Sequence, residues 1–349
     1  MTTINETILD ELVGRVIGDL GGAVSVPLVR IGDALGLYRT LKAIGPSKAH
    51  ELADAAGCAP RYVREWLAAQ AASGYVHHER GVFSLTPEQA LVFAEPDSPV
   101  NLIGAFDTAA AMVENQPKVQ SAFKTGRGVA WGDQAGCMFC AVARLFRPGY
   151  VNALVQEWLP ALNGVTDKLN AGATVADVGC GHGLSTILMA QAFPSSQFTG
   201  YDFHTGSIAA ATAHAQAHGL TNLHFEVGRA QDFDGRDFDL ITCFDCLHDM
   251  GDPEAAAAHI RKALKPGGAW MVVEPMAGDT LEENTNPVGR LYYSASTMIC
   301  VPTSLAQETG LALGAQAGER RLADVIRSGG FSHIRRAAQT PLNMILEAT

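Results

Sequence analysis

Residues 175–183 read VADVGCGHG, and this strand pattern followed by Gly179, Gly181 and Gly183 decides the fold. Glycines at the end of a parallel strand let a ligand approach the backbone, and their loop leads into the N-terminus of a helix. The spacing is G-x-G-x-G, because residue 184 is Leu rather than a third dinucleotide-type glycine. The segment predicts a ligand site on an α/β sheet and disfavours a dinucleotide-binding loop.

Strand and helix patterns alternate after residue 171, which is typical of a parallel sheet covered on both faces. The expected strands are residues 174–178, 198–201, 223–227, 240–244 and 270–273. Two further strands, 332–337 and 343–346, lie too close together for a helical crossover and predict an antiparallel hairpin at the sheet edge. We predict an α/β fold with a Rossmann-like seven-stranded sheet and a C-terminal antiparallel hairpin.

The N-terminal part, residues 1–140, is mainly helical and contains a winged-helix pattern. Ser47 is a plausible N-cap for a helix over residues 49–56, a second helix covers 60–71, and short strands at 75–76 and 82–85 flank a turn. Residues 46–80 carry four basic and four acidic side chains, so this region has no electrostatic footprint for DNA. We predict a dimerisation domain there, followed by a second domain over residues 141–349.

Composition narrows the possible partners and locations. The chain has 349 residues and a formal net charge of −11, which disfavours nucleic acid as a partner. The seven cysteines are scattered, which fits a reducing cytoplasm. The N-terminus lacks a basic start, and its apolar stretches are interrupted by Gly, Asp or Arg. We therefore expect a cytoplasmic protein with neither a secretory signal nor a membrane span.

Asp202 ends the second expected strand, 23 residues after Gly179 (202 − 179). A carboxylate at this place can accept hydrogen bonds from both hydroxyls of a ribose. The alternative interpretation is that Asp202 is the N-cap of the following helix. Because the glycine loop precedes it, we favour ribose binding.

The run from residue 175 to 274 resembles the class I methyltransferases that depend on S-adenosylmethionine (SAM). Four pieces carry the resemblance in order: the glycine loop, Tyr201-Asp202, the segment FDCLHD at 244–249, and LKPGG at 264–268. With the winged helix, the chain is similar to the dimeric small-molecule O-methyltransferases. The resemblance implies a homodimer, SAM as cofactor and S-adenosylhomocysteine as its product.

The resemblance also implies which residues bind SAM. Gly179, Gly181 and Gly183 would hold the methionine end, Asp177 would orient the amine, and Asp202 would bind the ribose. Phe203 would pack on the adenine. An Asp that often follows the third strand in that family is absent, and Ala230 and Gln231 would take its place. Phe244 and Asp245, from the third piece, complete the predicted cofactor site.

The segment Leu247-His248-Asp249-Met250 resembles the Leu-His-Asp-Trp segment that carries the general base of small-molecule O-methyltransferases. A histidine near neutral pKa is an efficient group for removing a hydroxyl proton. Glu274 and Glu319 resemble the two acids that flank this base. The alternative is that His248 shapes the cofactor pocket, that Glu274 ends a strand, and that Glu319 meets a helix dipole.

The insertion over residues 282–317 is more apolar and aromatic than a free loop, which favours a lid over an apolar acceptor above plain packing. Trp131, Tyr292, Tyr293 and Met298 are the predicted substrate contacts. The pairs Cys137–Cys140 and Cys243–Cys246 have C-x-x-C spacing, but they fall in an apparent helix and a core strand. Zinc sites of this kind need knuckle turns, so we predict no metal.

Three other functions stay open at this stage. An N- or S-methyltransferase could act by proximity, without a base. A nicotinamide oxidoreductase would use a similar sheet, although the glycine spacing disfavours it. A SAM-sensing winged-helix transcription regulator is disfavoured by the neutral helix-turn-helix and by the acidic chain.

Overall fold

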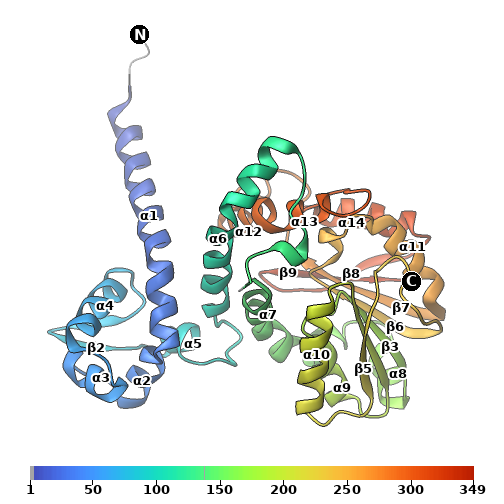
Figure 1. Ribbon diagram of the computed structural model, residues 1–349, viewed down its shortest axis with the longest axis horizontal. Helices are drawn as coiled ribbons and strands as arrows, with labels where there is room; N and C mark the ends of the chain where they lie inside the picture. The colour runs from blue at the N-terminus through green and yellow to red at the C-terminus, as the bar shows by residue number, and fades with distance from the viewer. Residues whose placement is uncertain (1–3, 137) are drawn as a thin grey trace. The chain divides into compact units, whose positions relative to one another are not determined.

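The computed structural model describes residues 4–136 and 138–349 (Figure 1). It has two compact units: Met1–Ala110 with Arg144–Pro148, and Ala111–Ala143 with Gly149–Thr349. Helix α6 (Ile103–Thr125) contributes to both. The expected domain division between residues 140 and 141 stays a prediction.

The first unit contains the predicted winged helix, coloured blue in Figure 1. The helices α3 (Ala49–Ala56) and α4 (Pro60–Ala72) precede the hairpin of β1 (His77–Glu79) and β2 (Val82–Ser84). The strand β1 starts two residues later than predicted, because the N–H groups of Tyr75 and Val76 still donate to the carbonyl of Gln70. The predicted N-cap Ser47 is also wrong: Lys48 is the N-cap, and Ser47 bridges to Phe83 instead.

Two further helices, α2 (Leu37–Ile44) and α5 (Pro87–Phe93), complete the core of this unit. Tyr38 lies at its centre, with its ring stacked on Phe93 and edge-on to Trp66. Its hydroxyl donates to Gln70 Oε1 at 2.6 Å. The unit therefore has its own apolar core, which includes the winged helix.

Helix α1 (Glu6–Ala34) has an exposed apolar surface over most of its length. Its buried residues are Ser25, Val29 and Gly32, whereas Val16 and Leu20 are 47% and 60% exposed. By length and composition alone, α1 is able to cross a membrane, with a mean hydropathy of 1.5 over 18 residues of which 11% are buried. Core helices of soluble proteins and signal sequences pass the same test, so the expectation of no membrane span stays a prediction.

The second unit contains one seven-stranded sheet in the order β5-β4-β3-β6-β7-β9-β8. The strands β3 to β7 run parallel, and β9 pairs antiparallel with both β7 and β8. The predicted α/β fold with its C-terminal antiparallel hairpin is confirmed. The strands are β3 (Thr174–Val178), β4 (Gln197–Asp202), β5 (Leu223–Val227), β6 (Phe238–Phe244), β7 (Leu264–Pro275), β8 (Ile334–Gln339) and β9 (Asn343–Ala348).

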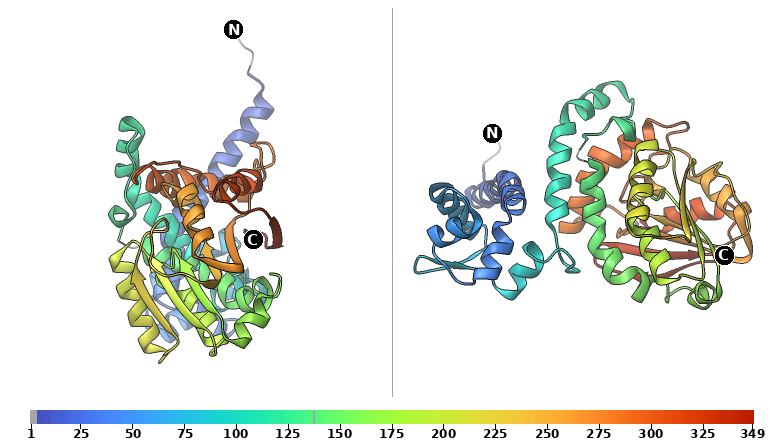
Figure 2. Two further views of the ribbon diagram at one scale, coloured as in Figure 1. Left: turned by 90° about the vertical axis from the view of Figure 1, so that its right-hand side faces the viewer. Right: turned by 60° about the horizontal axis from the view of Figure 1, so that its bottom comes forward.

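Helices connect and cover these strands, as Figures 1 and 2 show. Helices α9 and α10 pack on β4 and β5, and α11 packs on β7 and against α14. The predicted turn at residues 265–268 is part of β7, whose pairing with β6 shifts register there. The helices are η2 (Tyr150–Trp158), α8 (Val165–Ala171), α9 (Leu184–Ala192), α10 (Thr205–Ala217), α11 (Pro253–Ala263) and α14 (Gly318–Ser328), and α7 (Met138–Gly149) has residues in both units.

The insertion between β7 and α14 is helical. It contains α12 (Pro287–Ala295), the π-helical turn η4 (Ser296–Cys300) and α13 (Val301–Leu305). Two short 3₁₀ turns, η1 (Trp131–Asp133) and η3 (Leu247–Asp249), complete the parts of this unit that carry predicted site residues. Because π-helical turns are frequent at functional sites, Cys300 at the end of η4 is a candidate functional residue.

Candidate active site

The glycine loop after β3 has the left-handed backbone that only glycine adopts easily. Gly179 and Gly183 have φ values of +77° and +78°. A Cβ on Gly179 would lie 2.6 Å from Cys246 Sγ, and one on Gly183 would lie 2.4 Å from the Phe225 ring. A Cβ on Gly181 would meet nothing within 4 Å. The loop is therefore closely packed at both ends and open at its centre.

Asp202 lies at this open centre. Its Oδ2 accepts from the Gly181 N–H at 2.9 Å, and its Oδ1 accepts from the His204 N–H at 2.8 Å. Burial raises the pKa of this carboxyl, while the two backbone donors act in the opposite direction. The N-cap of α10 is His204, so the N-cap interpretation of Asp202 is wrong. A fixed carboxylate thus lies beside the open centre of the glycine loop, and its predicted contact with a ribose stays a prediction.

Asp177 is fully buried and hydrogen-bonded within the unit. Its Oδ2 accepts from Ser185 Oγ at 2.7 Å and Thr186 Oγ1 at 2.6 Å, and its Oδ1 accepts from Thr242 Oγ1 at 3.0 Å. Burial raises its pKa, and these three hydroxyls oppose that effect. The bonds tie β3 to α9 and β6. The predicted contact with the amine of SAM stays a prediction.

The residues predicted for the adenine side are spread along one edge of the sheet. Phe203 is 46% exposed and lines a hollow of about 440 Å³ together with Glu226, Gly228 and Arg229. Ala230 and Gln231 are half-buried beside it. Phe203 thus follows β4, and Ala230 and Gln231 follow the neighbouring strand β5. Their contacts with adenine stay predictions.

Phe244 ends β6, and Asp245 follows it. Phe244 is buried edge-on against Tyr150, with ring centroids 5.3 Å apart. Asp245 has a φ of +48° and accepts from Asn343 Nδ2 at 2.7 Å. Burial, followed by the charge of Glu274, raises the pKa of Asp245 well above its usual range. Both residues therefore belong to the carboxyl edge of the sheet, where ligands of α/β folds bind.

His248 and Glu274 meet at the carboxyl ends of two neighbouring strands, β6 and β7. His248 Nδ1 lies 2.5 Å from Glu274 Oε2, and Glu274 Oε1 accepts from the Leu247 N–H at 2.9 Å. Both carboxylate oxygens are engaged, so the acid cannot rotate without losing a bond. In the neutral ring this holds the proton on Nδ1 and leaves the lone pair on Nε2.

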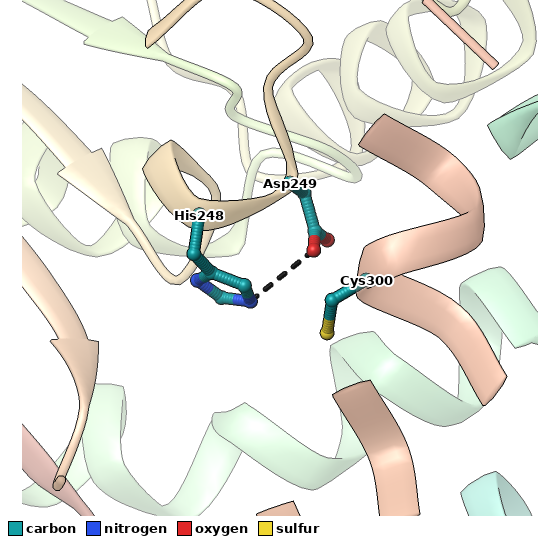
Figure 3. A group of neighbouring side chains, drawn as sticks. All are labelled: His248, Asp249 and Cys300. Atoms are coloured by element: carbon teal, nitrogen blue, oxygen red, sulfur yellow. Dashed lines mark ion pairs between the residues drawn. The ribbon is translucent and has the colours of Figure 1, made fainter. Parts of the chain in front are cut away.

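The other ring nitrogen faces two groups that sequence reasoning missed. His248 Nε2 lies 3.2 Å from Asp249 Oδ1, and the Cys300 thiol of η4 lies beside both (Figure 3). Asp249 directly follows His248 in the sequence, so its place near the imidazole could have been predicted. Cys300 carried no such signal, because the fold alone brings the insertion to η3.

Burial alone would lower the pKa of His248. The charges of Glu274 and Asp249 outweigh burial and hold the pKa well above its usual value. Burial raises the pKa of Cys300 to about 12, so this residue is a neutral thiol at physiological pH. The site therefore joins an anionic carboxylate, an imidazole and a thiol in one buried group.

Three of the predicted substrate residues lie together around Cys300. Trp131, Tyr292 and Met298 pack against one apolar cluster that includes Cys300. Tyr292 also donates its hydroxyl to the Leu342 carbonyl at 2.7 Å. Tyr293, the fourth, is 38% exposed and lies outside that cluster. The insertion thus brings apolar side chains to the residues that contact His248.

Glu319 lies in the first turn of α14 and pairs with a different partner. Arg336 Nε donates to Glu319 Oε2 at 2.8 Å, and both line a hollow of about 760 Å³ with Asp279 and Arg320. Of the two predicted acids, Glu274 contacts the imidazole, whereas Glu319 contacts Arg336. An orienting role for Glu319 stays a prediction without a described contact to His248.

The cysteine pairs have different surroundings. Cys243 is fully buried in β6, and Cys246 Sγ donates to the Val178 carbonyl at 3.3 Å. Cys140 is exposed, and Cys137 lies outside the described residues. Cys243 and Cys246 thus serve packing behind the glycine loop.

The fold and the glycine loop define a Rossmann-like SAM-binding class, and comparison with known families gives the same assignment. Residues 169–318 match the family described as "Methyltransferase domain". Residues 22–94 match the "Rv2258c-like winged HTH domain". The chain thus carries a methyltransferase domain of the SAM-dependent class behind a winged-helix domain, and SAM is the cofactor of this class.

Curated relatives share the methyltransferase region. The trans-aconitate 2-methyltransferase of Deinococcus radiodurans is 38% identical over 107 residues, which cover 31% of this chain and 40% of that protein. The ubiquinone biosynthesis O-methyltransferase of Pseudomonas paraeruginosa is 31% identical over 127 residues, covering 35% and 51%. The chain therefore spans about half or less of the length of these relatives.

Solved structures share the fold along nearly the whole chain. Human N-acetylserotonin methyltransferase in complex with SAM has a TM-score of 0.70 at 16% identity and covers 100% of this chain and 99% of its own. The mitomycin 7-O-methyltransferase MmcR has a TM-score of 0.68 at 19% identity and covers 98% and 99%. At such identities the likeness concerns the fold.

Proposed function

We propose that this protein transfers a methyl group from SAM to a hydroxyl of a small, partly apolar molecule, with His248 as the general base. The observation that carries the proposal is the buried contact of 2.5 Å between His248 Nδ1 and Glu274 Oε2 at the carboxyl edge of the sheet. Similar folds in O-methyltransferases and the apolar cluster around Cys300 support it.

The residues divide into two tasks. Asp202 and the glycine loop hold the cofactor, which supplies an electrophilic methyl group when bound. At a pH above its raised pKa the His248 imidazole is neutral, and Glu274 then keeps the remaining proton on Nδ1, so that Nε2 accepts the proton of the acceptor hydroxyl. The carboxylate also stabilises the imidazolium that forms, as in other carboxylate–histidine pairs. Trp131, Tyr292 and Met298 surround an apolar acceptor and exclude water from it.

The test is the variant His248→Ala, assayed for methyl transfer to a hydroxyl acceptor and for SAM affinity by calorimetry. Loss of a general base should lower the rate by roughly 10²–10⁴-fold with nearly unchanged SAM affinity. If rate and SAM affinity fell together, His248 would belong to the cofactor pocket. If most of the activity remained, an N- or S-methyltransferase acting by proximity would replace the base mechanism.

We also propose that the protein is a cytoplasmic homodimer without a nucleic-acid or membrane partner. The apolar surface of α1, which includes the exposed residues Val16 and Leu20, supports this proposal, because a second copy of the chain would bury it. A SAM-sensing transcription regulator is the competing hypothesis, because the first unit is a winged helix. A mobility shift of DNA that depends on SAM would favour that hypothesis.

A further inference from the structure

Three side chains with metal-binding atoms meet at the carboxyl edge of the sheet (Figure 3). They are His248 and Asp249 of η3 and Cys300 of η4, whose nitrogen, oxygen and sulfur atoms all lie within 4.8 Å of one another. The fold brings them together from distant parts of the sequence, since η4 belongs to the insertion between β7 and α14. The C-x-x-C pairs, on which the expectation of no metal rests, are not part of this group.

The spacing of these atoms fits the edges of a tetrahedral zinc site. Zn²⁺ binds imidazole nitrogen and carboxylate oxygen at about 2.0–2.2 Å and thiolate sulfur at about 2.3 Å, so neighbouring ligand atoms lie about 3.4–3.6 Å apart. His248 Nε2 lies 3.2 Å from Asp249 Oδ1, which is close to the length of such an edge. Cys300 Sγ lies no more than 4.8 Å from either atom, so a shift on the order of 1 Å completes the other two edges.

Protons link the three groups in the structure. The Cys300 thiol is a hydrogen-bond partner of both His248 and Asp249, and His248 Nε2 forms an ion pair with Asp249. A divalent cation bound between the three atoms replaces these contacts, and the thiol proton and the Nε2 proton leave to solvent. Two positive charges arrive as two leave, so the buried group keeps its net charge.

The surroundings orient the ligands and favour a cation. Glu274 Oε2 lies 2.5 Å from His248 Nδ1, and Glu274 Oε1 accepts from the Leu247 N–H at 2.9 Å. A carboxylate on the far nitrogen of a metal-binding imidazole is the usual outer partner at such sites, because it fixes the ring and makes the ligand more basic. The negative charges of Glu274 and Asp249 both act on His248, so they also stabilise a cation bound at Nε2.

The ligand set selects the ion. One nitrogen, one oxygen and one sulfur ligand suit Zn²⁺, whereas Mg²⁺ and Ca²⁺ prefer oxygen ligands alone. Three protein ligands leave the fourth position for water, as in catalytic zinc sites. His248 and Cys300 are 4% and 6% exposed, but the Asp249 side chain is 22% exposed and gives a cation access from solvent.

We propose that His248 Nε2, Asp249 Oδ1 and Cys300 Sγ form a zinc site whose occupation reversibly inhibits methyl transfer. Zinc binding depends on the three ligands and not on the proposed function. Inhibition rests on the proposed function, because a cation at Nε2 occupies the lone pair that accepts the proton of the acceptor hydroxyl. Zn²⁺ and that proton therefore compete for one atom.

The experiment uses the full-length protein after treatment with a chelator and desalting. Zn²⁺ is titrated by calorimetry and Co²⁺ by absorption spectroscopy. A single ion should bind per chain, and Co²⁺ should give a thiolate-to-metal charge-transfer band together with the visible bands of four-coordinate cobalt. A Co²⁺ spectrum without the thiolate band, or an absence of Zn²⁺ binding, overturns the proposal.

Cys300→Ser and Asp249→Asn each remove a ligand, and Cys140→Ser, which changes an exposed cysteine of α7, is the matched control. Even an outer partner of a ligand contributes about 10–100-fold to metal affinity, so both ligand variants should bind Zn²⁺ at least about tenfold more weakly. Cys300→Ser should also lose the thiolate band, which the control should keep. Loss of the band in Cys140→Ser would assign the ion to the Cys137–Cys140 pair and overturn the proposal.

Failure of the two proposals is distinguishable. Methyl transfer should fall as the zinc site fills and return when a chelator removes the ion. Full occupation of the site with unchanged turnover refutes Nε2 as the base and leaves the zinc site in place. Turnover that is lost in His248→Ala, in a wild type that binds no zinc, refutes the zinc site and leaves the base in place. SAM affinity, measured for each variant, reports whether the fold is intact.

Discussion

Glu274→Gln isolates the charge that acts on His248. The amide oxygen of Gln can still accept from the Leu247 N–H, which bonds Glu274 Oε1 at 2.9 Å, so the loop after β6 keeps one of its anchors. The interaction with His248 Nδ1 at 2.5 Å loses its negative charge. Hydrogen bonds to charged groups contribute roughly 1.5–3 kcal/mol, and one pKa unit corresponds to about 1.4 kcal/mol. The pKa of His248 should therefore fall.

The assay is titration of the imidazole by ¹H–¹⁵N NMR of histidine-labelled protein, which needs no methyl acceptor. The His248 signal is assigned by its loss in His248→Gln. In the wild type it should titrate well above the ordinary value of about 6.5, because Glu274 and Asp249 outweigh burial. The variant should titrate lower, and Glu319→Gln, whose acid pairs with Arg336, should leave the signal unmoved. An unchanged titration in Glu274→Gln would refute the electrostatic reasoning.

The raised pKa of His248 also makes the free energy of unfolding depend on pH. Since the folded pKa of His248 is raised above its unfolded value, its ion pairs stabilise the protein fully below the unfolded pKa. That stabilisation is lost as pH rises through the folded pKa. The difference in unfolding free energy between wild type and Glu274→Gln should accordingly narrow as pH increases, which urea titrations at several pH values would measure.

Two further predictions concern the cofactor and the assembly. Asp202→Ala removes the carboxylate fixed by Gly181 and His204, so SAM affinity measured by calorimetry should fall at least about tenfold with the fold intact; an unchanged affinity contradicts ribose binding. The full-length protein should be a dimer by light scattering at micromolar concentration, and Val16→Glu with Leu20→Glu should give a folded monomer, because both side chains are exposed. A wild-type monomer would exclude the dimer.

The sheet and the central pair could be predicted because strand order fixes them. The motif residues follow the ends of β6 and β7, and these strands pair in register with Phe244 opposite Val273. Glu274 therefore directly follows Val273, which pairs with β6. The turn η3 brings His248 back to Glu274. The glycine loop and Asp202 follow in the same way from the pairing of β3 with β4, in which Val178 lies opposite Tyr201.

The remaining contacts depend on segments without such a register. Cys300 reaches the site through α12 and η4, whose path depends on packing rather than on a period in the sequence. Glu319 follows the same insertion, and its position on α14 gives it Arg336 of β8 as partner. The exposure of α1 likewise depends on packing rather than on a period in the sequence: Val29 is buried within its own unit, whereas Leu20 is 60% exposed.

The movement of charge in the proposed reaction explains why acidic side chains are buried at this site. Asp245, Asp249 and Glu274 lie close to one imidazole, and burial raises the pKa of the first two. A neutral acceptor and a sulfonium cation enter the reaction; an ether, a neutral thioether and an imidazolium leave it. The positive charge thus moves from sulfur to His248 without entering or leaving the pocket. The charges of Glu274 and Asp249, which act on His248, stabilise the imidazolium at the end of the transfer, and this offsets the cost of burying them.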